Sequence, residues 1–160
     1  MNTRIVLSGT PLEHESEWIE VPAGDFIMGS GNNDHMAFND ETPQHTTTIY
    51  TPYLIARTPT TNDQYKAFVQ DTGHRGPRHW RRGGDVPDHP VTSVDWNDAL
   101  AYCKWLTQEM QKAGRFLEGT NLRVTLPNEP QWARAARMTH RYGVYVVQYE
   151  VGTIPKSGMK

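Results

Sequence analysis

The clearest structural signal in this chain of 160 residues is the stretch Val94-Asp95-Trp96-Asn97-Asp98-Ala99-Leu100-Ala101-Tyr102-Cys103-Lys104-Trp105-Leu106. Asp95 is a favourable N-cap, and Asp98 lies where a negative charge stabilises the start of a helix. Gly114 is expected to end the helix. Its apolar residues recur at helical spacing and form one stripe, made of Trp96, Leu100, Cys103, Leu106 and Met110. We therefore predict a long helix that packs against a core through this stripe.

Two further helices are predicted on either side of it. The segment Thr61 to Gln64 has the pattern of a capping box, and Gly73 is placed to stop the helix that follows. Asn128 to Gln131 repeats the pattern for a third helix, with Pro130 in the first turn, where its missing N–H costs nothing. Ala135, Ala136 and Trp132 are expected to face inward from this helix, and Trp96 is expected in the core as well.

Short strands complete the predicted α/β fold. Residues Trp18 to Gly29 suggest two strands separated by a turn at Pro22 to Asp25. His45 to Arg57 is rich in β-favouring residues, and the proline within it marks a bend or an edge. Leu122 to Leu126 and Tyr142 to Val151 are further strand candidates.

The composition limits the possible functions. The formal net charge is −2, from 16 basic and 18 acidic residues, so nothing indicates a nucleic-acid partner. No apolar segment approaches the roughly 20 residues that cross a bilayer, and no signal peptide is visible, so we expect no membrane partner and a cytoplasmic location. We expect residues 1–15 to be a loose leader and residues 16–160 to form one partial domain.

One basic segment stands out in this nearly neutral chain. It holds the candidate ligand-binding residues Arg75, Arg78, His79, Trp80, Arg81 and Arg82, close to His74. A loop of this kind is either simply solvated or binds an anion. Trp80 is the aromatic residue that we most expect to be exposed.

Metal-binding patterns are absent from the sequence, and we predict no metal ligands. The seven histidines show no spacing typical of a zinc site. Asp34, Asp40 and Glu41 fall in one loop, which is either solvated or binds a hard cation. His45 is expected to form a hydrogen-bonded pair with Glu41, and Arg134 and Arg137 to hold a loop carboxylate.

Several motifs, in order along the chain, resemble the formylglycine-generating-enzyme (sulfatase-modifying-factor) family between Trp18 and Arg137. They are Phe26-Ile27-Met28-Gly29-Ser30, Glu41-Thr42-Pro43-Gln44-His45, Thr61-Asn62-Asp63-Gln64-Tyr65 with Phe68, Asp88-His89-Pro90-Val91, Val94 to Ala99, Tyr102 to Leu106, Leu126 to Trp132, and Ala135-Ala136-Arg137. The motif residues to which we assign a structural role are Met28, Gly29, His45, Asn62, His89, Pro90, Trp96, Cys103, Trp105, Pro127, Glu129, Trp132 and Arg137.

The resemblance implies an irregular α/β fold related to C-type lectins, here truncated. Complete family members carry copper and calcium, and they oxidise a sulfatase cysteine to formylglycine with copper held by two cysteines and with molecular oxygen. This chain has one cysteine, Cys103, at a position that is usually structural. The resemblance therefore implies no catalytic residue, copper site or calcium site within this chain, and the motifs of the family's later half are absent after Arg141.

Three interpretations of function follow. The first is a truncated family member without autonomous oxidation of cysteine. Its expected partner is a complementing C-terminal half, or a second copy bound through an exposed apolar face. The second is a ligand- or protein-binding module on a lectin-like scaffold, with the basic segment as its recognition surface. The third is a non-functional gene remnant.

Overall fold

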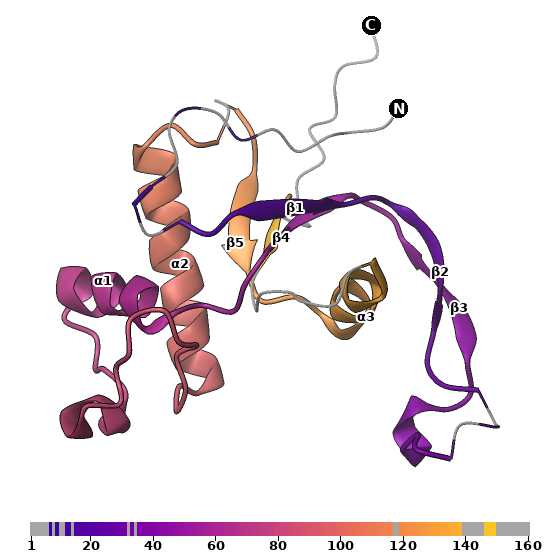
Figure 1. Ribbon diagram of the computed structural model, residues 1–160. Coiled ribbons are helices and arrows are strands. Elements are labelled where there is room, and N and C mark those ends of the chain that lie inside the picture. The colour runs from indigo at the N-terminus through magenta and orange to yellow at the C-terminus, as the bar shows by residue number, and fades with distance from the viewer. Residues whose placement is uncertain are drawn as a thin grey trace, which may run out of the picture.

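The computed structural model in Figure 1 describes residues 7, 9, 12–13, 15–31, 33, 35–116, 119–138 and 146–149, the last of these as backbone only. The helices are α1 (Asn62–Thr72), α2 (Trp96–Lys112) and α3 (Glu129–Met138), with short 3₁₀ helices η1 (Asn39–Glu41) and η2 (Arg78–Arg82). The strands are β1 (Trp18–Val21), β2 (Gly24–Met28), β3 (His45–Ile49), β4 (Tyr53–Ala56), β5 (Leu122–Thr125) and β6 (Val146–Tyr149). The predicted mixed α/β class is confirmed.

The strands form a four-stranded antiparallel sheet, in the order β1-β4-β6-β5, and a separate antiparallel pair, β2 and β3. Strand β1 pairs with β4, and β2 pairs with β3, both antiparallel. The two pairs follow each other as one bent ribbon, which arches over α3 in Figure 1. The predicted turn at Pro22 to Asp25 is therefore wrong. The chain only bends there, because the partners of both strands come from residues 45–56. The bend predicted at Pro52, between β3 and β4, is confirmed.

Strand β4 is the centre of the fold, because all four of its residues are buried. Alternate side chains of a strand point to opposite faces. Leu54 and Ala56 accordingly join a core with α1 and α2, whereas Tyr53 and Ile55 join a second core with Ala135 of α3. Figure 1 shows α2 and α3 on opposite sides of β4. The sheet is thus covered by helices on both faces.

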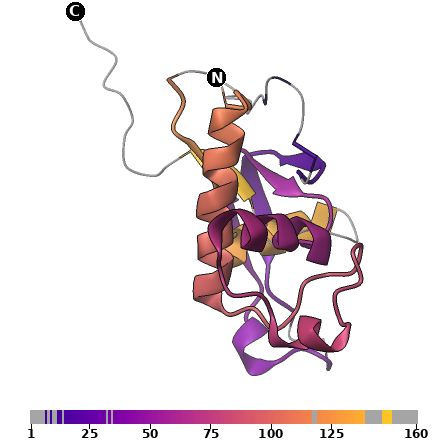
Figure 2. The same ribbon diagram turned by 90° about the vertical axis from the view of Figure 1, so that its left-hand side faces the viewer.

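The core on the α1–α2 side is built from aromatic rings. Tyr65 and Phe68 of α1 meet Tyr102 and Trp105 of α2, with ring centroids 5.2–5.7 Å apart. Such pairs stabilise a core beyond the area that they bury. Figure 2 shows α1 crossing in front of α2. Cys103, Leu106 and Met110 of α2 lie in the same core, so the predicted apolar stripe is confirmed over these residues.

The capping predictions are confirmed at all three helices. The Thr61 hydroxyl accepts from the Gln64 backbone N–H, and the Gln64 side chain accepts from the Thr61 N–H. Asp95 and Asp98 exchange the same two bonds at 3.0 Å, and so do Asn128 and Gln131 at 2.9 Å. Each pair satisfies two backbone donors that the helix start leaves free.

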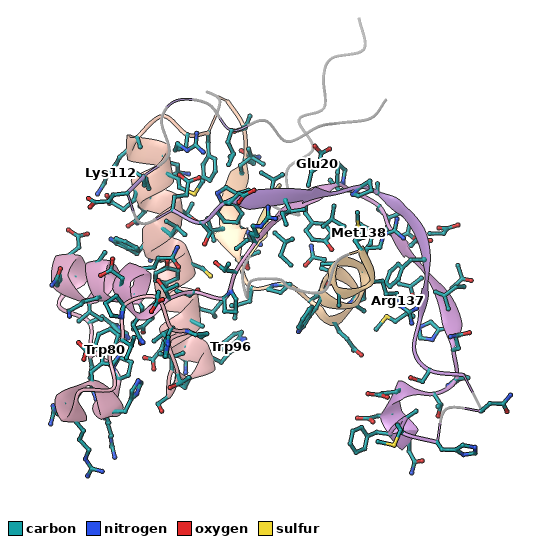
Figure 3. All side chains as sticks on the ribbon, in the orientation of Figure 1. Glu20, Trp80, Trp96, Lys112, Arg137 and Met138 are labelled. Atoms are coloured by element: carbon teal, nitrogen blue, oxygen red, sulfur yellow. The ribbon has the colours of Figure 1, made fainter. Side chains whose placement is uncertain are left out.

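Two tryptophans predicted in the core are exposed instead. Trp96 is 66% exposed and Trp132 is 50% exposed. Each stands in the first turn of its helix, before the part of the helix that the sheet covers. Figure 3 shows Trp96 at the lower end of α2. Ala135 is buried as predicted, but Ala136 is exposed.

Few residues of the predicted leader 1–15 are described, so its boundary remains a prediction. Among them, Glu15 forms a bidentate ion pair with Arg115, with N–O distances of 2.9 Å, and it also accepts from the Trp18 indole N–H at 2.6 Å. The side chains of Glu15 and Arg115 are only 0% and 7% exposed. Within the described residues, no helix is both long and apolar enough to span a membrane.

Candidate functional site

Five of the structural-motif residues line one polar pocket of about 310 Å³ between the β2–β3 ribbon and α3. Its walls include Met28, Gly29, His45, Glu129 and Arg137. The Arg137 guanidinium donates to the Gly29 carbonyl at 3.1 Å. Motifs that are about 100 residues apart therefore meet here, and their contacts hold α3 under the ribbon.

The expected role of Arg134 and Arg137 needs correction. Arg134 donates to the backbone carbonyl of Asp25 at 3.1 Å, and its guanidinium lies 5.5 Å from the centre of the Phe26 ring. Among the described residues, both arginines thus donate to main-chain carbonyls and not to a carboxylate, because α3 packs against β2, where the carbonyls of Asp25 and Gly29 lie within reach. A cation over an aromatic face adds to this attachment.

The expected pair of His45 and Glu41 does not form. The Nδ1 atom of His45 lies 3.0 Å from the Pro43 carbonyl oxygen. The Glu41 carboxylate instead faces the backbone N–H of Phe38, at 3.3 Å, and the Ser30 hydroxyl. The 3₁₀ helix η1 causes this, since it turns Glu41 back toward its own start.

The acidic loop offers little to a cation in the part that is described. Asp34 lies outside the described residues, and Asp40 and Glu41 are exposed. Over residues 35–116 and the other described segments, no group of three His, Cys, Asp or Glu side chains is arranged to hold a metal ion.

The basic segment is held to α1 by Asn62, which is 2% exposed. The Asn62 amide oxygen accepts from the Trp80 indole N–H at 2.8 Å, and its amide nitrogen donates to the Val86 carbonyl at 2.8 Å. Its backbone N–H donates to the His89 carbonyl at 2.8 Å, and Pro90 bridges to the neighbouring Thr61. One buried amide therefore ties both Trp80, within the segment, and Val86, just after it, to α1. Sequence reasoning identified Asn62 as a motif residue but missed this role, which a polar residue on the inner face of α1 could have suggested.

The expected exposure of Trp80 is wrong. Its ring packs edge-on against Tyr65 at 6.0 Å and adjoins the α1–α2 core. Gly76 makes the approach possible, because a Cβ atom there would lie 3.0 Å from Trp80. Figure 3 shows Trp80 between η2 and α1. The tryptophan is thus an anchor of the segment rather than its exposed tip.

The arginines of the segment remain on the surface. Arg75, Arg78, Arg81 and Arg82 are exposed, and His79 is half-buried. Within the described residues, the side chains of Arg78, Arg81 and Arg82 make no hydrogen bond or ion pair. The segment therefore presents guanidinium groups from a fixed backbone.

His74, at the start of the segment, is tied to the N-terminal turn of α2. Its Nε2 atom lies 2.8 Å from the Asp98 carboxylate. The pKa of Asp98 is lowered, first by its hydrogen bond with the Asp95 backbone N–H and then by its bond to His74. Trp105, further along α2, donates to the Asp71 carboxylate at 2.7 Å. These bonds join the segment, α1 and α2 into one unit.

A second pocket, of about 290 Å³, opens at the start of α2. Its lining includes Tyr65, Trp96 and Cys103. The Tyr65 hydroxyl is buried without a hydrogen-bond partner among the described residues, and its pKa is raised by burial and then by Asp98 and Asp95. Cys103 is 3% exposed, and burial raises the pKa of its thiol to about 12. Cys103 is thus a neutral core residue, as predicted, but sequence reasoning did not predict the pocket.

Three motif residues lie at or just before the start of α3. Pro127 lies between β5 and α3, and Glu129 begins α3, where its charge favours the helix start. Trp132 is half-exposed on the same helix. The motif residues therefore fall into two groups, one around α3 and the ribbon and one around α1 and α2.

Comparison with known proteins supports the family indicated by these motifs. Residues 5–158 match the profile of the Sulfatase-modifying factor enzyme 1-like domain. A formylglycine-generating enzyme of Streptomyces coelicolor is 30% identical over 163 residues, which cover 74% of this chain and 46% of that enzyme. A hercynine oxygenase of Mycolicibacterium smegmatis is 26% identical over 145 residues, which cover 72% of this chain and 30% of that protein.

The fold also matches a solved structure. PvdO from Pseudomonas aeruginosa superposes with a TM-score of 0.67 at 23% identity, over 88% of this chain and 54% of PvdO. The mixed α/β architecture is therefore similar to that of PvdO. The chain spans about half the length, or less, of these relatives.

Proposed function

The chain belongs to the sulfatase-modifying factor enzyme 1-like family, and we propose that it forms the frame of a formylglycine-generating-type domain without itself oxidising cysteine to formylglycine. The observation that carries this proposal is the state of its one cysteine. Cys103 is buried in α2, and its thiol has a pKa of about 12. A thiol in this state is neither a metal-binding thiolate nor a nucleophile near neutral pH.

The copper centre that the family implies does not fit these residues. Two thiolates would have to meet at one soft metal ion, and the 160 residues supply a single cysteine, which is buried. We therefore derive no oxidation step for this chain.

A role as a frame also agrees with the range of relatives. The same region matches both a formylglycine-generating enzyme and a hercynine oxygenase, two proteins named for different reactions. Fold does not imply function, so a region common to two reactions supports a positioning role better than a catalytic one.

The partner that we propose is a polypeptide equivalent to the part of these relatives that the chain does not match. Trp96 and Trp132, which are 66% and 50% exposed, offer apolar surface for it. Exposed aromatic surface of this kind is typical of interaction sites.

The test of the oxidation proposal is direct. The purified chain would be incubated with copper(I), oxygen, a thiol reductant and a cysteine-containing sulfatase peptide, and the peptide would be analysed by mass spectrometry. We expect no aldehyde product, whereas the Streptomyces coelicolor enzyme run in parallel should form it. Conversion by this chain that the Cys103→Ser variant abolishes would overturn the proposal.

The partner is tested separately by light scattering of the chain, alone and with the C-terminal part of the Streptomyces coelicolor enzyme. We expect a one-to-one complex that Trp96→Ser and Trp132→Ser weaken. A stable dimer of the chain that is insensitive to both changes would contradict the assignment of this surface.

A second candidate function is anion binding by the basic segment, and the fixed position of its arginines favours it. Arg78, Arg81 and Arg82 are exposed on a backbone that Asn62 and Trp80 hold in place. Preorganised guanidinium groups bind phosphate or carboxylate oxygens in pairs. Titration with inorganic phosphate, followed by NMR, should shift the Trp80 indole signal, and replacing the three arginines with glutamine should remove the shift. Replacing Arg57, an exposed arginine outside the segment that pairs with Glu17, with glutamine is the matched control.

A further inference from the structure

We propose that Arg78 and Arg81 together form a clamp for one phosphate group, a tetrahedral dianion that is either free or the end of a phosphate monoester. The inference rests on the anion binding proposed for the basic segment and goes further, because it assigns the site to two of the arginines and names the ligand. The clamp is separate from the polar pocket under the ribbon and from the surface proposed for the partner polypeptide.

The 3₁₀ geometry of η2 brings these two side chains together. A 3₁₀ helix has three residues per turn, so the side chains at positions i and i+3 eclipse each other, about 6 Å apart along the axis. Arg78 and Arg81 have this spacing within η2. Trp80 takes another face of the same turn and packs against α1, where Asn62 accepts from its indole N–H. The two arginines therefore leave one side of η2 from a backbone that is held in place.

The clamp has no counter-charge within the described fold. Both arginines are exposed, and neither side chain makes a hydrogen bond or an ion pair with a described residue. Figure 1 shows η2 as the short helix below α1, at the margin of the molecule. Because neighbouring like charges on a helix destabilise each other, an anion between the two guanidinium groups relieves their repulsion and also accepts charge-assisted hydrogen bonds.

The next face of η2 is less suited to an anion. His79 and Arg82 share it, because they too are three residues apart. The pKa of the nearby Asp85 is lowered first by its hydrogen bond with Lys66 and in smaller part by the charge of His79. A carboxylate thus already lies beside this face, which sets Arg82 apart from the clamp.

Arg75, before η2, also lies near a carboxylate. The pKa of Asp98 is lowered first by its bond with the Asp95 N–H and then by His74, and the charge of Arg75 adds to the effect. An anion at Arg75 would therefore meet the negative charge of Asp98. Of the exposed arginines in the segment, Arg78 and Arg81 are the two without such a neighbour among the described residues.

Two guanidinium groups match one phosphate better than one carboxylate. Each guanidinium can donate two parallel N–H bonds to a pair of oxygens. A carboxylate has a single pair of oxygens, whereas a phosphate monoester has three terminal oxygens and a charge of about −1.5 to −2 near neutral pH. One phosphate group can therefore bind both arginines at once. A phosphodiester has two terminal oxygens and one charge, so it fits the clamp less well.

The experiment titrates four anions into the 160-residue chain at pH 8 and constant ionic strength, with the Trp80 indole NMR signal as the readout. Inorganic phosphate and glycerol 2-phosphate carry the dianion free and as an ester. Dimethyl phosphate is the diester, and glutarate places its two charges on separate carboxylates. We expect the two phosphate dianions to bind about tenfold more tightly than the other two anions, as the loss of one charge-assisted hydrogen bond predicts.

Single substitutions locate the site. Arg78→Gln and Arg81→Gln should each weaken phosphate binding about tenfold. Arg82→Gln removes an equal charge from the same short helix and should weaken binding less than about threefold, so it is the matched control. Arg81→Lys keeps the charge but loses the planar fork, and it should also bind phosphate clearly less tightly. Since these positions are exposed, all four variants should keep the urea midpoint of the unmodified chain.

The outcomes separate this inference from the function on which it rests. If none of the four anions binds, the anion binding of the basic segment fails together with the clamp. If phosphate binds but Arg82→Gln weakens it as much as Arg78→Gln, or Arg81→Lys leaves it unchanged, anion binding stands and the clamp is refuted. Binding of glutarate or dimethyl phosphate as tight as that of phosphate would refute the ligand assignment. Tighter binding of glycerol 2-phosphate than of inorganic phosphate would identify an ester as the ligand, and the reverse would identify the free anion.

Discussion

Replacement of Asn62 with alanine is the sharpest test of how the basic segment is held. The change deletes the bond from the Trp80 indole N–H and the bond to the Val86 carbonyl, both 2.8 Å long. Each bond contributes about 0.5–1.5 kcal/mol net, and a buried partner left unpaired costs about 1–3 kcal/mol. Because Trp80 and Val86 can partly recover hydrogen bonds with water, we expect a total loss of about 2–4 kcal/mol.

The assay is urea unfolding followed by tryptophan fluorescence. At about 2–4 °C per kcal/mol for a domain of this size, the melting temperature should also fall by roughly 5–15 °C. Trypsin provides a local readout, since the arginines around Trp80 should be cleaved faster once the segment is released. Asn97→Ala is the matched control: Asn97 is exposed on α2, and its loss should change the free energy of unfolding by less than about 0.5 kcal/mol.

The reasoning would be refuted if Asn62→Ala were as stable as Asn97→Ala. It would also be refuted if the loss of stability came without faster cleavage near Trp80, because the anchor would then lie elsewhere. The Trp80→Phe variant sharpens the test. Its effect and that of Asn62→Ala should be less than additive, since both remove the same bond.

Other predictions concern charge and the thiol. Arg115→Ala leaves the buried Glu15 carboxylate without its ion-pair partner and should lower the free energy of unfolding by about 3–5 kcal/mol. Arg57→Ala breaks an exposed pair and should lower it by less than about 1 kcal/mol, so similar urea midpoints for the two variants would contradict the expected difference. Cys103, with a pKa of about 12 and 3% exposure, should react with a thiol reagent at pH 8 only after unfolding; rapid labelling of the native chain would count against its burial. Folding lowers the pKa of Asp98. The charged Asp98 carboxylate should therefore stabilise the fold above the ordinary carboxyl pKa of about 4, and this stabilisation should be lost as the pH falls through the lower pKa of the folded state. Asp98→Asn should therefore flatten the acid limb of the stability profile, and an unchanged limb would argue against this linkage.

Much of the local structure could be predicted from the sequence, because local signals depend on residues close together in the chain. The capping pairs of α1, α2 and α3 each span three residues, and all three form as predicted. The stripe of Cys103, Leu106 and Met110 is buried for the same reason, since helical spacing places these residues on one face.

Other features depend on what packs against a residue from far away in the chain. The pairing of β1 with β4 replaces the turn suggested at Pro22, and the amide of Asn62 draws in Trp80, which sequence reasoning placed at the surface. Trp96 shows the opposite case, because a residue on an apolar stripe stays exposed where no strand or helix of the described fold covers it. Periodicity can predict which face of a helix is apolar. How far along that face the burial extends, and whether a pocket is left beside it, depends on where the sheet and the neighbouring helix end.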